Sequence, residues 1–169
     1  QKYRDFENRV VDAIQQRCGP GVVLTQEVPL KNGVHRSRAD LVVLAPPFLY
    51  VVELKNWTNA SISTGANAHL QVSSREGGAP RRYPDPRQQL RFMADHLLGL
   101  RNRMVHPGHM YADELPAWCR ECMPQLVVVV DDSNEVAEGN NPIPLWTLSK
   151  FLERLPQQGP DIGIGPEEL

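Results

Sequence analysis

Two acidic residues and a lysine border a pair of short apolar segments, and their spacing places them at one site. The segments, residues 41–45 and 48–52, are rich in Val and Leu and are separated by Pro46-Pro47. Each segment predicts a strand that is buried on both faces, and the break predicts an antiparallel hairpin. In a hairpin that is symmetric about the prolines, Asp40 lies opposite Glu53, and directly opposed residues have Cβ atoms roughly 4.5–5.5 Å apart.

Two carboxylates at this distance repel each other, so either a cation lies between them or one of them stays protonated. A hard divalent metal ion is bound by oxygen ligands of this kind. Lys55 follows Glu53 by two residues, so its side chain leaves the same face of the predicted strand. An ammonium group in this place is suited to stabilise charge that develops on a phosphate.

The sequence around this pair resembles the nuclease-related domain (NERD) family of the PD-(D/E)XK nuclease superfamily. In that family Arg-Ala-Asp opens one strand, as residues 38–40 do here, and a Val-x-Glu-x-Lys-Asn-Trp motif closes the next, as residues 51–57 do. The resemblance extends to Glu7 on a first helix. It also includes residues 85–89 (DPRQQ), where Asp85 replaces the Asn of the family motif.

The resemblance implies a metal-dependent nuclease that hydrolyses phosphodiester bonds, as an endonuclease acting on DNA rather than RNA. Asp40 and Glu53 would bind Mg²⁺ or Mn²⁺, with the backbone carbonyl of Leu54 as a further ligand. Lys55 would orient the nucleophile or stabilise the phosphate. By analogy, such domains accompany other domains of a parent chain and take part in defence against foreign DNA.

Two further residues have open roles. The resemblance makes Glu7 an active-site carboxylate that holds a second metal ion or a metal-bound water, and it makes Gln89 a residue that positions water or substrate. From the residues alone, Glu7 could equally be a surface side chain that favours the start of a helix. Gln89 could equally be a solvated residue in the first turn of its helix.

The elements that position these residues can be predicted along the chain. Helical spacing of apolar residues predicts a helix over residues 3–17. Strands over 22–30, 34–45 and 48–55 form a three-stranded antiparallel meander, with a turn at Asn32-Gly33. A small hairpin is expected at 60–63 and 69–73, loops at 75–83 and 135–142, and a helix from Pro86 to about residue 103.

After that helix, the apolar residues 125–130 predict a strand parallel to the meander. Residues 144–146 suit an edge strand, and Thr147 suits the cap of a last helix. The expected fold class is α/β: a restriction-endonuclease-like mixed sheet, with a central antiparallel meander plus a parallel strand, flanked by helices on both faces.

The chain of 169 residues suits one domain, which we place at residues 1–156. Residues 157–169 are rich in Gly and Pro, and we expect a flexible tail that links to further domains. No apolar segment is long enough to span a membrane, and no targeting segment is visible. Three cysteines argue for a reducing compartment, hence a cytoplasmic protein.

A basic stretch lies next to the predicted site. Residues 75–103 contain seven Arg and three acidic residues, although the whole chain has a net charge of −2. We expect Arg81, Arg82, Arg87 and Arg91 to contact nucleic acid, because a phosphate backbone attracts such a patch. The alternative is an ordinary solvated face.

A second metal site is conceivable between the basic helix and the last strand. His106 and His109, followed by Cys119 and Cys122, form two pairs with ligand spacing, and four such ligands suit a structural Zn²⁺. The alternative is that the cysteines are plain core residues. This cluster is not part of the family motif.

Two other classes of function remain open at this point. The chain could be a non-cleaving nucleic-acid-binding module with a nuclease-like fold, or an interaction domain that uses apolar surface. The intact set of Asp40, Glu53 and Lys55 favours the nuclease.

Overall fold

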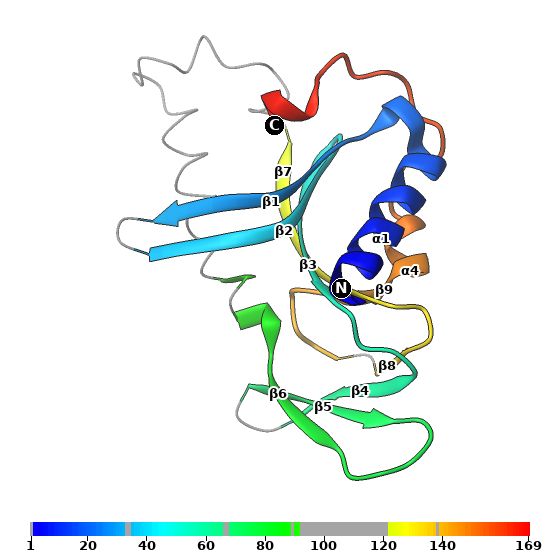
Figure 1. Ribbon diagram of the computed structural model, residues 1–169. Coiled ribbons are helices and arrows are strands. Elements are labelled where there is room, and N and C mark those ends of the chain that lie inside the picture. Colours follow the sequence, from blue (N-terminus) through cyan, green and yellow to red (C-terminus); the bar gives the residue numbers. More distant parts are fainter. Residues whose placement is uncertain (1, 33–34, 66–67, 89, 92–121, 138) are drawn as a thin grey trace.

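The computed structural model describes residues 2–32, 35–65, 68–88, 90–91, 122–137 and 139–169. Its main sheet has five strands in the order β1 (Val23–Asn32), β2 (His35–Ala45), β3 (Phe48–Lys55), β7 (Met123–Val130) and β9 (Leu145–Thr147) (Figure 1). The first three strands are antiparallel, and β7 and β9 join in parallel. The predicted meander, the parallel strand and the α/β class are confirmed, and the architecture is consistent with a restriction-endonuclease-like fold.

The hairpin of β2 and β3 has the predicted register. Leu41 pairs with Val52, and Ala45 pairs with Phe48, so the hairpin is symmetric about Pro46-Pro47. All five residues of β2 from Leu41 to Ala45 are buried. The apolar segments are therefore covered on both faces, as their composition predicts.

Helices cover one face of the main sheet. Helix α1 (Lys2–Cys18) and helix α4 (Leu148–Leu152) lie side by side on it (Figure 1). Helix α1 buries Phe6, Val10 and Ile14, and Phe151 of α4 stacks edge-on against Tyr50 of β3 with ring centroids 5.3 Å apart. Thr147 caps α4 by accepting a hydrogen bond from the backbone N of Lys150, as expected.

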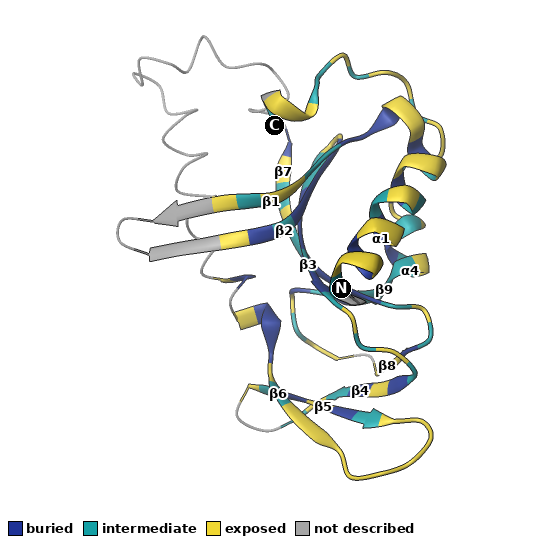
Figure 2. Ribbon diagram, in the orientation of Figure 1, coloured by how far each residue is buried: buried dark blue, intermediate teal, exposed yellow. Residues whose placement is uncertain are grey.

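A second sheet packs against part of the other face, with strand order β6 (Arg81–Pro84), β5 (His69–Ser74), β4 (Ala60–Thr64) and β8 (Glu135–Val136). Its inner residues Ile62 and Leu70 are buried with Val128 of the main sheet. Buried positions recur at every second residue within β4 and β5 (Figure 2). The β4–β5 hairpin was predicted. The expected loops at 75–83 and 135–142 were wrong in part, because each contains a strand.

The sequence pattern does not predict strands β6 and β8, and the reason is physical. Each pairs with the small sheet, β6 beside β5 and β8 beside β4. Their own sequences, RRYP and EV, have no alternating apolar pattern, so only the neighbouring strand shows that they are strands. On the same face, the residues at 86–88 and 90–91 are helical and Leu90 is buried. The remainder of the helix expected there lies outside the described residues.

The last residues of the chain pack back onto the main sheet. Ile162, Ile164 and Leu169 contact an apolar cluster that contains Val23 and Leu44. The backbone N of Gln158 donates to the carbonyl of Arg17 over 2.8 Å. Two short 3-10 helices, η1 (Gly19–Gly21) and η3 (Pro166–Glu168), flank this region. The domain boundary at residue 156 and the linker role of the tail stay predictions.

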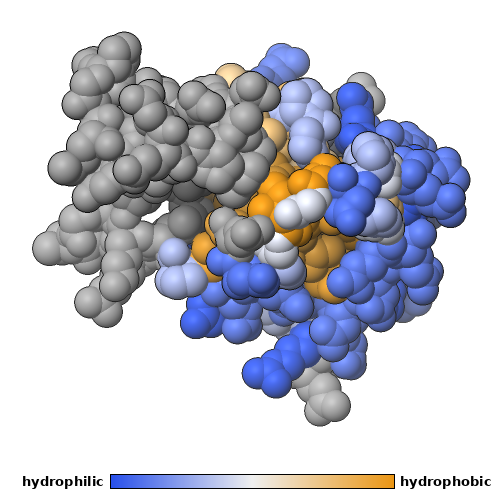
Figure 3. Space-filling model, turned by 90° about the horizontal axis from the view of Figure 1, so that it is seen from above, coloured by the Kyte–Doolittle hydropathy of each residue, from blue (hydrophilic) through white to orange (hydrophobic). Residues whose placement is uncertain are grey.

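Figure 3 views the molecule from the end at which the C-terminus lies in Figure 1. Hydrophobic residues gather at the centre of this face and hydrophilic residues border them. Near this end Met123, the first residue of β7, is 45% exposed. Among the helices of the described residues, none combines the length and the apolar character that crossing a membrane requires.

Candidate active site

Asp40, Glu53 and Lys55 meet where the pairing of β2 with β3 ends, in the middle of β2 and at the last residues of β3. Asp40 lies one step beyond the Leu41–Val52 pair, and its Oδ2 accepts a hydrogen bond from the backbone N of Leu54 over 2.8 Å. The Lys55 Nζ lies 3.7 Å from Oε1 of Glu53. The structure therefore brings together the three residues that the hairpin register predicts, and their catalytic roles stay predictions.

Burial and the neighbouring negative charge act strongly on the carboxyl group of Glu53. Its side chain is 14% exposed. Burial, reinforced by the charge of Asp40, raises the pKa of Glu53 to about 7, although Lys55 acts in the opposite direction. A carboxyl group with this pKa is only partly ionised at neutral pH, so a cation bound beside it would favour the ionised form.

Tyr3 is a site residue that the sequence reasoning missed. Burial raises the pKa of its phenol above the ordinary range, and a hydrogen bond with Asp40 and the charges of Asp40, Glu7 and Glu53 add to this effect. The hydroxyl therefore keeps its proton and can donate it to Asp40. The available signal was the four-residue spacing from Tyr3 to Glu7, which places both residues on one face of α1.

Glu7 lies inside the protein. It is 3% exposed, and its Oε1 accepts a hydrogen bond from Nε2 of Gln26 on β1 over 3.1 Å. The alternative that Glu7 is a surface residue at a helix start is therefore wrong. Helix α1 directs both Tyr3 and Glu7 toward the end of the sheet where Asp40 and Glu53 lie.

The oxygen atoms at this site suit a hard divalent cation. In a strand, the N–H and C=O of one residue point toward the same neighbouring strand. Because the N–H of Leu54 bonds to Asp40, its carbonyl lies on that side too. Within the described part of the chain, no three His, Cys, Asp or Glu side chains are grouped to hold a metal ion. The two carboxylates and the Leu54 carbonyl are the oxygen atoms that could hold Mg²⁺ or Mn²⁺ here, and metal binding stays a prediction.

A buried amide supports the segment that follows Lys55. Asn134, which is 6% exposed, donates through Nδ2 to the carbonyls of Trp57 and Asp131. Its Oδ1 accepts from the backbone N of Ala60 over 3.1 Å. These bonds tie the connection between β3 and β4 to the end of β7. The sequence reasoning did not single out Asn134.

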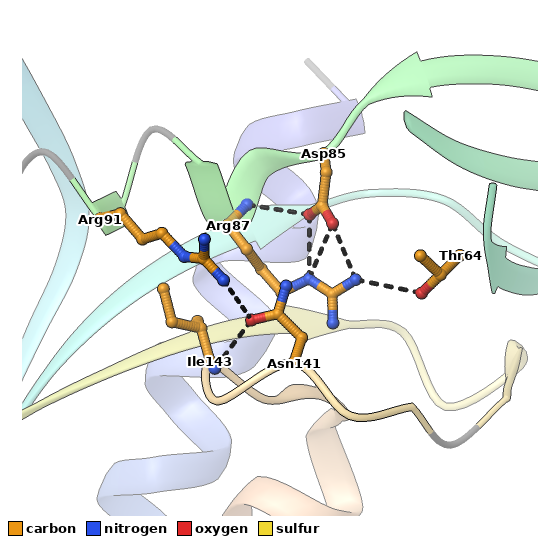
Figure 4. Close-up of polar contacts among 6 residues, drawn as sticks. All are labelled: Thr64, Asp85, Arg87, Arg91, Asn141 and Ile143. Atoms are coloured by element: carbon orange, nitrogen blue, oxygen red, sulfur yellow. Dashed lines mark hydrogen bonds and ion pairs between the residues drawn. The ribbon is translucent and has the colours of Figure 1, made fainter. Parts of the chain in front are cut away.

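The four predicted DNA-contacting arginines do not lie in one patch. Arg81 and Arg82 are exposed on β6. Arg91 is exposed and donates to Oδ1 of Asn141 over 3.4 Å. Arg87 is 6% exposed and forms an ion pair with Asp85 at 2.8 Å (Figure 4). Arg81, Arg82 and Arg91 are therefore available at the surface, whereas Arg87 is buried beside Asp85.

Several predicted residues lie where the structure gives no description. Gln89 is outside the described residues, as are His106, His109 and Cys119. Cys122 is described, and it is buried in the apolar cluster with Val23 and Leu44. The zinc site and the role of Gln89 stay predictions.

Comparison with known proteins agrees with the motif at this site. The family model of the nuclease-related domain matches residues 2–112, a span that includes Tyr3, Glu7, Asp40, Glu53 and Lys55. No curated protein and no solved structure matches the chain. Since the matched span covers more than half of the sequence, the chain belongs to the nuclease-related domain (NERD) family.

Proposed function

We propose that this domain is a Mg²⁺- or Mn²⁺-dependent endonuclease that hydrolyses phosphodiester bonds in DNA. The observation that supports the proposal is the cluster of Asp40, Glu53 and Lys55 at the point where the pairing of β2 with β3 ends. The cluster places two carboxylates beside one ammonium group, in a chain whose family is nuclease-related.

The chain's own residues have distinct tasks in this proposal. Asp40, Glu53 and the Leu54 carbonyl hold the metal ion, which when bound lowers the pKa of water and offsets charge on the phosphate. Lys55 stabilises the negative charge that develops on the phosphate oxygens. Tyr3 holds Asp40 in position by a hydrogen bond, and Glu7 adds negative charge nearby.

DNA is the proposed partner because the domain carries exposed arginines in addition to the candidate active site, and arginines bind the phosphate backbone. Arg81 and Arg82 project from β6, and Arg91 lies on the helical residues that follow. Backbone contacts of this kind supply affinity without sequence preference. We extend the proposal to a cytoplasmic protein that acts with other domains of its parent chain in defence against foreign DNA.

Lys55 gives the sharpest test of the chemistry. Purified protein is incubated with supercoiled plasmid over a titration of Mg²⁺ or Mn²⁺. We expect nicking by the wild type and a loss of at least about 100-fold in Lys55→Ala, the scale on which removing a group that stabilises transition-state charge acts. Thr58→Ala, an exposed substitution just outside the family motif, is the matched control and should cut like the wild type.

The thermal melt of each variant shows whether it folds. Unchanged nicking by folded Lys55→Ala would remove Lys55 from the mechanism. A wild type that binds plasmid at every metal concentration but never cuts it would instead favour the non-cleaving binding module.

A further inference from the structure

A cavity of about 410 Å³ lies between the two sheets, away from the carboxylates of the candidate active site. Its apolar wall includes Ile62 of β4, Leu70 of β5 and Leu145 of β9. Its polar wall includes Thr64, Arg87, Asn141 and Lys150. None of Asp40, Glu53 and Lys55 lines it, so this cavity is a separate feature of the fold.

The side chain of Arg87 is fixed by hydrogen bonds, but one of its guanidinium nitrogens has no partner among the described residues. Its Nε lies 2.9 and 3.0 Å from the two carboxylate oxygens of Asp85, and its Nη2 lies 2.8 Å from Oδ2 (Figure 4). Nη2 also reaches Oγ1 of Thr64 at 3.4 Å. Nη1 makes no hydrogen bond to any of the residues that the structure describes. A buried guanidinium is thus fixed in orientation, with one nitrogen left for a ligand.

The cavity has an excess of positive charge. Lys150 of α4 lines it, is half-buried, and forms no ion pair with the described residues. Arg91 stands at its border, where it donates to Asn141. Among the described lining residues there is no carboxylate, and Asp85 offsets only the charge of Arg87. The remaining charge is unmatched within the described cavity, which favours an anionic ligand.

We propose that this cavity binds a phosphate monoester. A fixed guanidinium, an ammonium group and the hydroxyl of Thr64 together offer the donors that a terminal phosphate accepts. The volume is within the range of pockets that bind small molecules, and the apolar wall can cover an attached base or sugar. The ligand is a free mononucleotide or the 5′-phosphorylated end of an oligonucleotide, which share this chemistry.

The register of the main sheet places the cavity relative to the candidate active site. Lys55 pairs with Val130, and Val130 pairs with Thr147, which lines the cavity. Because partners in adjacent strands face the same side, Lys55 and Thr147 lie on one face, two strand spacings or roughly 10 Å apart. A nucleic-acid end bound in the cavity would therefore lie close to Lys55. The binding site itself stands whether or not the domain cleaves DNA.

The test is a binding titration of the whole chain in EDTA, which removes any contribution of divalent metal at the carboxylates. The probes are deoxyadenosine 5′-monophosphate against deoxyadenosine, and a 5′-phosphorylated single-stranded oligonucleotide against the same oligonucleotide with a 5′-hydroxyl. We expect the phosphorylated member of at least one pair to bind about tenfold more tightly, which corresponds to about 1.4 kcal/mol. Preference in the first pair alone identifies the free mononucleotide, and preference in the second identifies the nucleic-acid end.

Two variants probe the cavity without breaking the Asp85–Arg87 pair. Lys150→Gln removes one charge. Gly139→Val adds volume to the cavity wall, where a new Cβ would lie 3.7 Å from Oγ1 of Thr64, an ordinary contact. Both should lose the preference for phosphate, whereas Arg4→Gln, which removes an exposed charge on α1 at the other face of the main sheet, should keep it. Equal binding of both members in each pair, or full preference in both folded cavity variants, would overturn the proposal.

Discussion

At the scale of single residues, Glu53 shows how the fold changes ordinary chemistry. A carboxyl group on a surface is ionised at neutral pH, but burial and the neighbouring Asp40 raise the pKa of Glu53 to about 7. The metal-binding proposal and the pH dependence of stability both depend on this one side chain. Asp40, by contrast, is held by two donors, the backbone N of Leu54 and the hydroxyl of Tyr3.

The raised pKa of Glu53 predicts a pH-dependent stability in metal-free buffer. The pKa is 4.5 ordinarily and about 7 in the folded chain. Between these values the folded state binds more protons than the unfolded state, so the free energy of unfolding falls as the pH rises. Glu53→Gln cannot ionise, so it should be more stable than the wild type at pH 8 by on the order of 2 kcal/mol.

Urea unfolding in EDTA at pH 4 and pH 8 measures this difference. The stabilisation by Glu53→Gln should be present at pH 8 and largely absent at pH 4, where the wild-type carboxyl is protonated as well. Glu135→Gln, an exposed substitution on β8, serves as the control and should show no such change. A difference between wild type and Glu53→Gln that is the same at both pH values would refute the burial argument.

At the scale of elements, the small sheet gives the chain both an outer surface and an inner one. Its inner residues bury Ile62 and Leu70 against the main sheet. Strand β6 of this sheet carries Arg81 and Arg82, and both side chains are exposed. Pairing with β5 fixes their position, since Arg81 lies beside Val72 and Arg82 beside Gln71. A strand, more than a helix, therefore presents the predicted phosphate contacts.

Removing the two β6 charges tests the DNA-binding role of this strand. The double variant Arg81→Gln and Arg82→Gln should bind DNA more weakly, and the slope of log K against log salt should fall by roughly one per lost phosphate contact. Fluorescence anisotropy over a salt series in EDTA gives this slope. Arg154→Gln, next to α4 on the opposite face of the main sheet, should leave the slope unchanged. If all three proteins share one slope, β6 is only a solvated edge.

At the scale of the whole molecule, the C-terminal segment packs closely against the backbone that follows α1. Gly21, after α1, approaches Gly159 so closely that a Cβ on Gly21 would lie 2.5 Å from the Cα of Gly159. The backbone hydrogen bond from Gln158 to Arg17 and the contacts of Ile162 and Ile164 lie beside it. We call this packed region the C-terminal seam. The C-terminal segment therefore adds to the apolar interior beside β1.

Gly21→Ala should displace this segment, because the added methyl group meets backbone and not a flexible side chain. We expect a loss of about 1–3 kcal/mol in the free energy of unfolding, the usual cost of overpacking. Residues after 157 should also become more sensitive to limited proteolysis. Gly139→Ala, whose new Cβ makes only an ordinary contact, is the control. Wild-type stability together with wild-type proteolysis in Gly21→Ala would show that the seam contributes nothing.

The sequence by itself determined the hairpin and the residues at its end. Period-two geometry and the central Pro46-Pro47 fix the register, so Asp40 falls opposite Glu53 and Lys55 leaves the same face. These relations are local: they depend on a turn and on counting along two adjacent strands. The family motif in the same stretch could be recognised for the same reason.

The tertiary structure alone decided what depends on distant neighbours. Tyr3 joins Asp40 only because α1 packs across the sheet, and Glu7 is buried for the same reason. Arg87 appeared as part of a basic run, but the fold places it in the interior with Asp85 and leaves it facing a cavity. Strands β6 and β8 form because they pair with β5 and β4, respectively. Burial, pKa and edge pairing arise from contacts between segments far apart in the chain, and no local pattern of residue types encodes them.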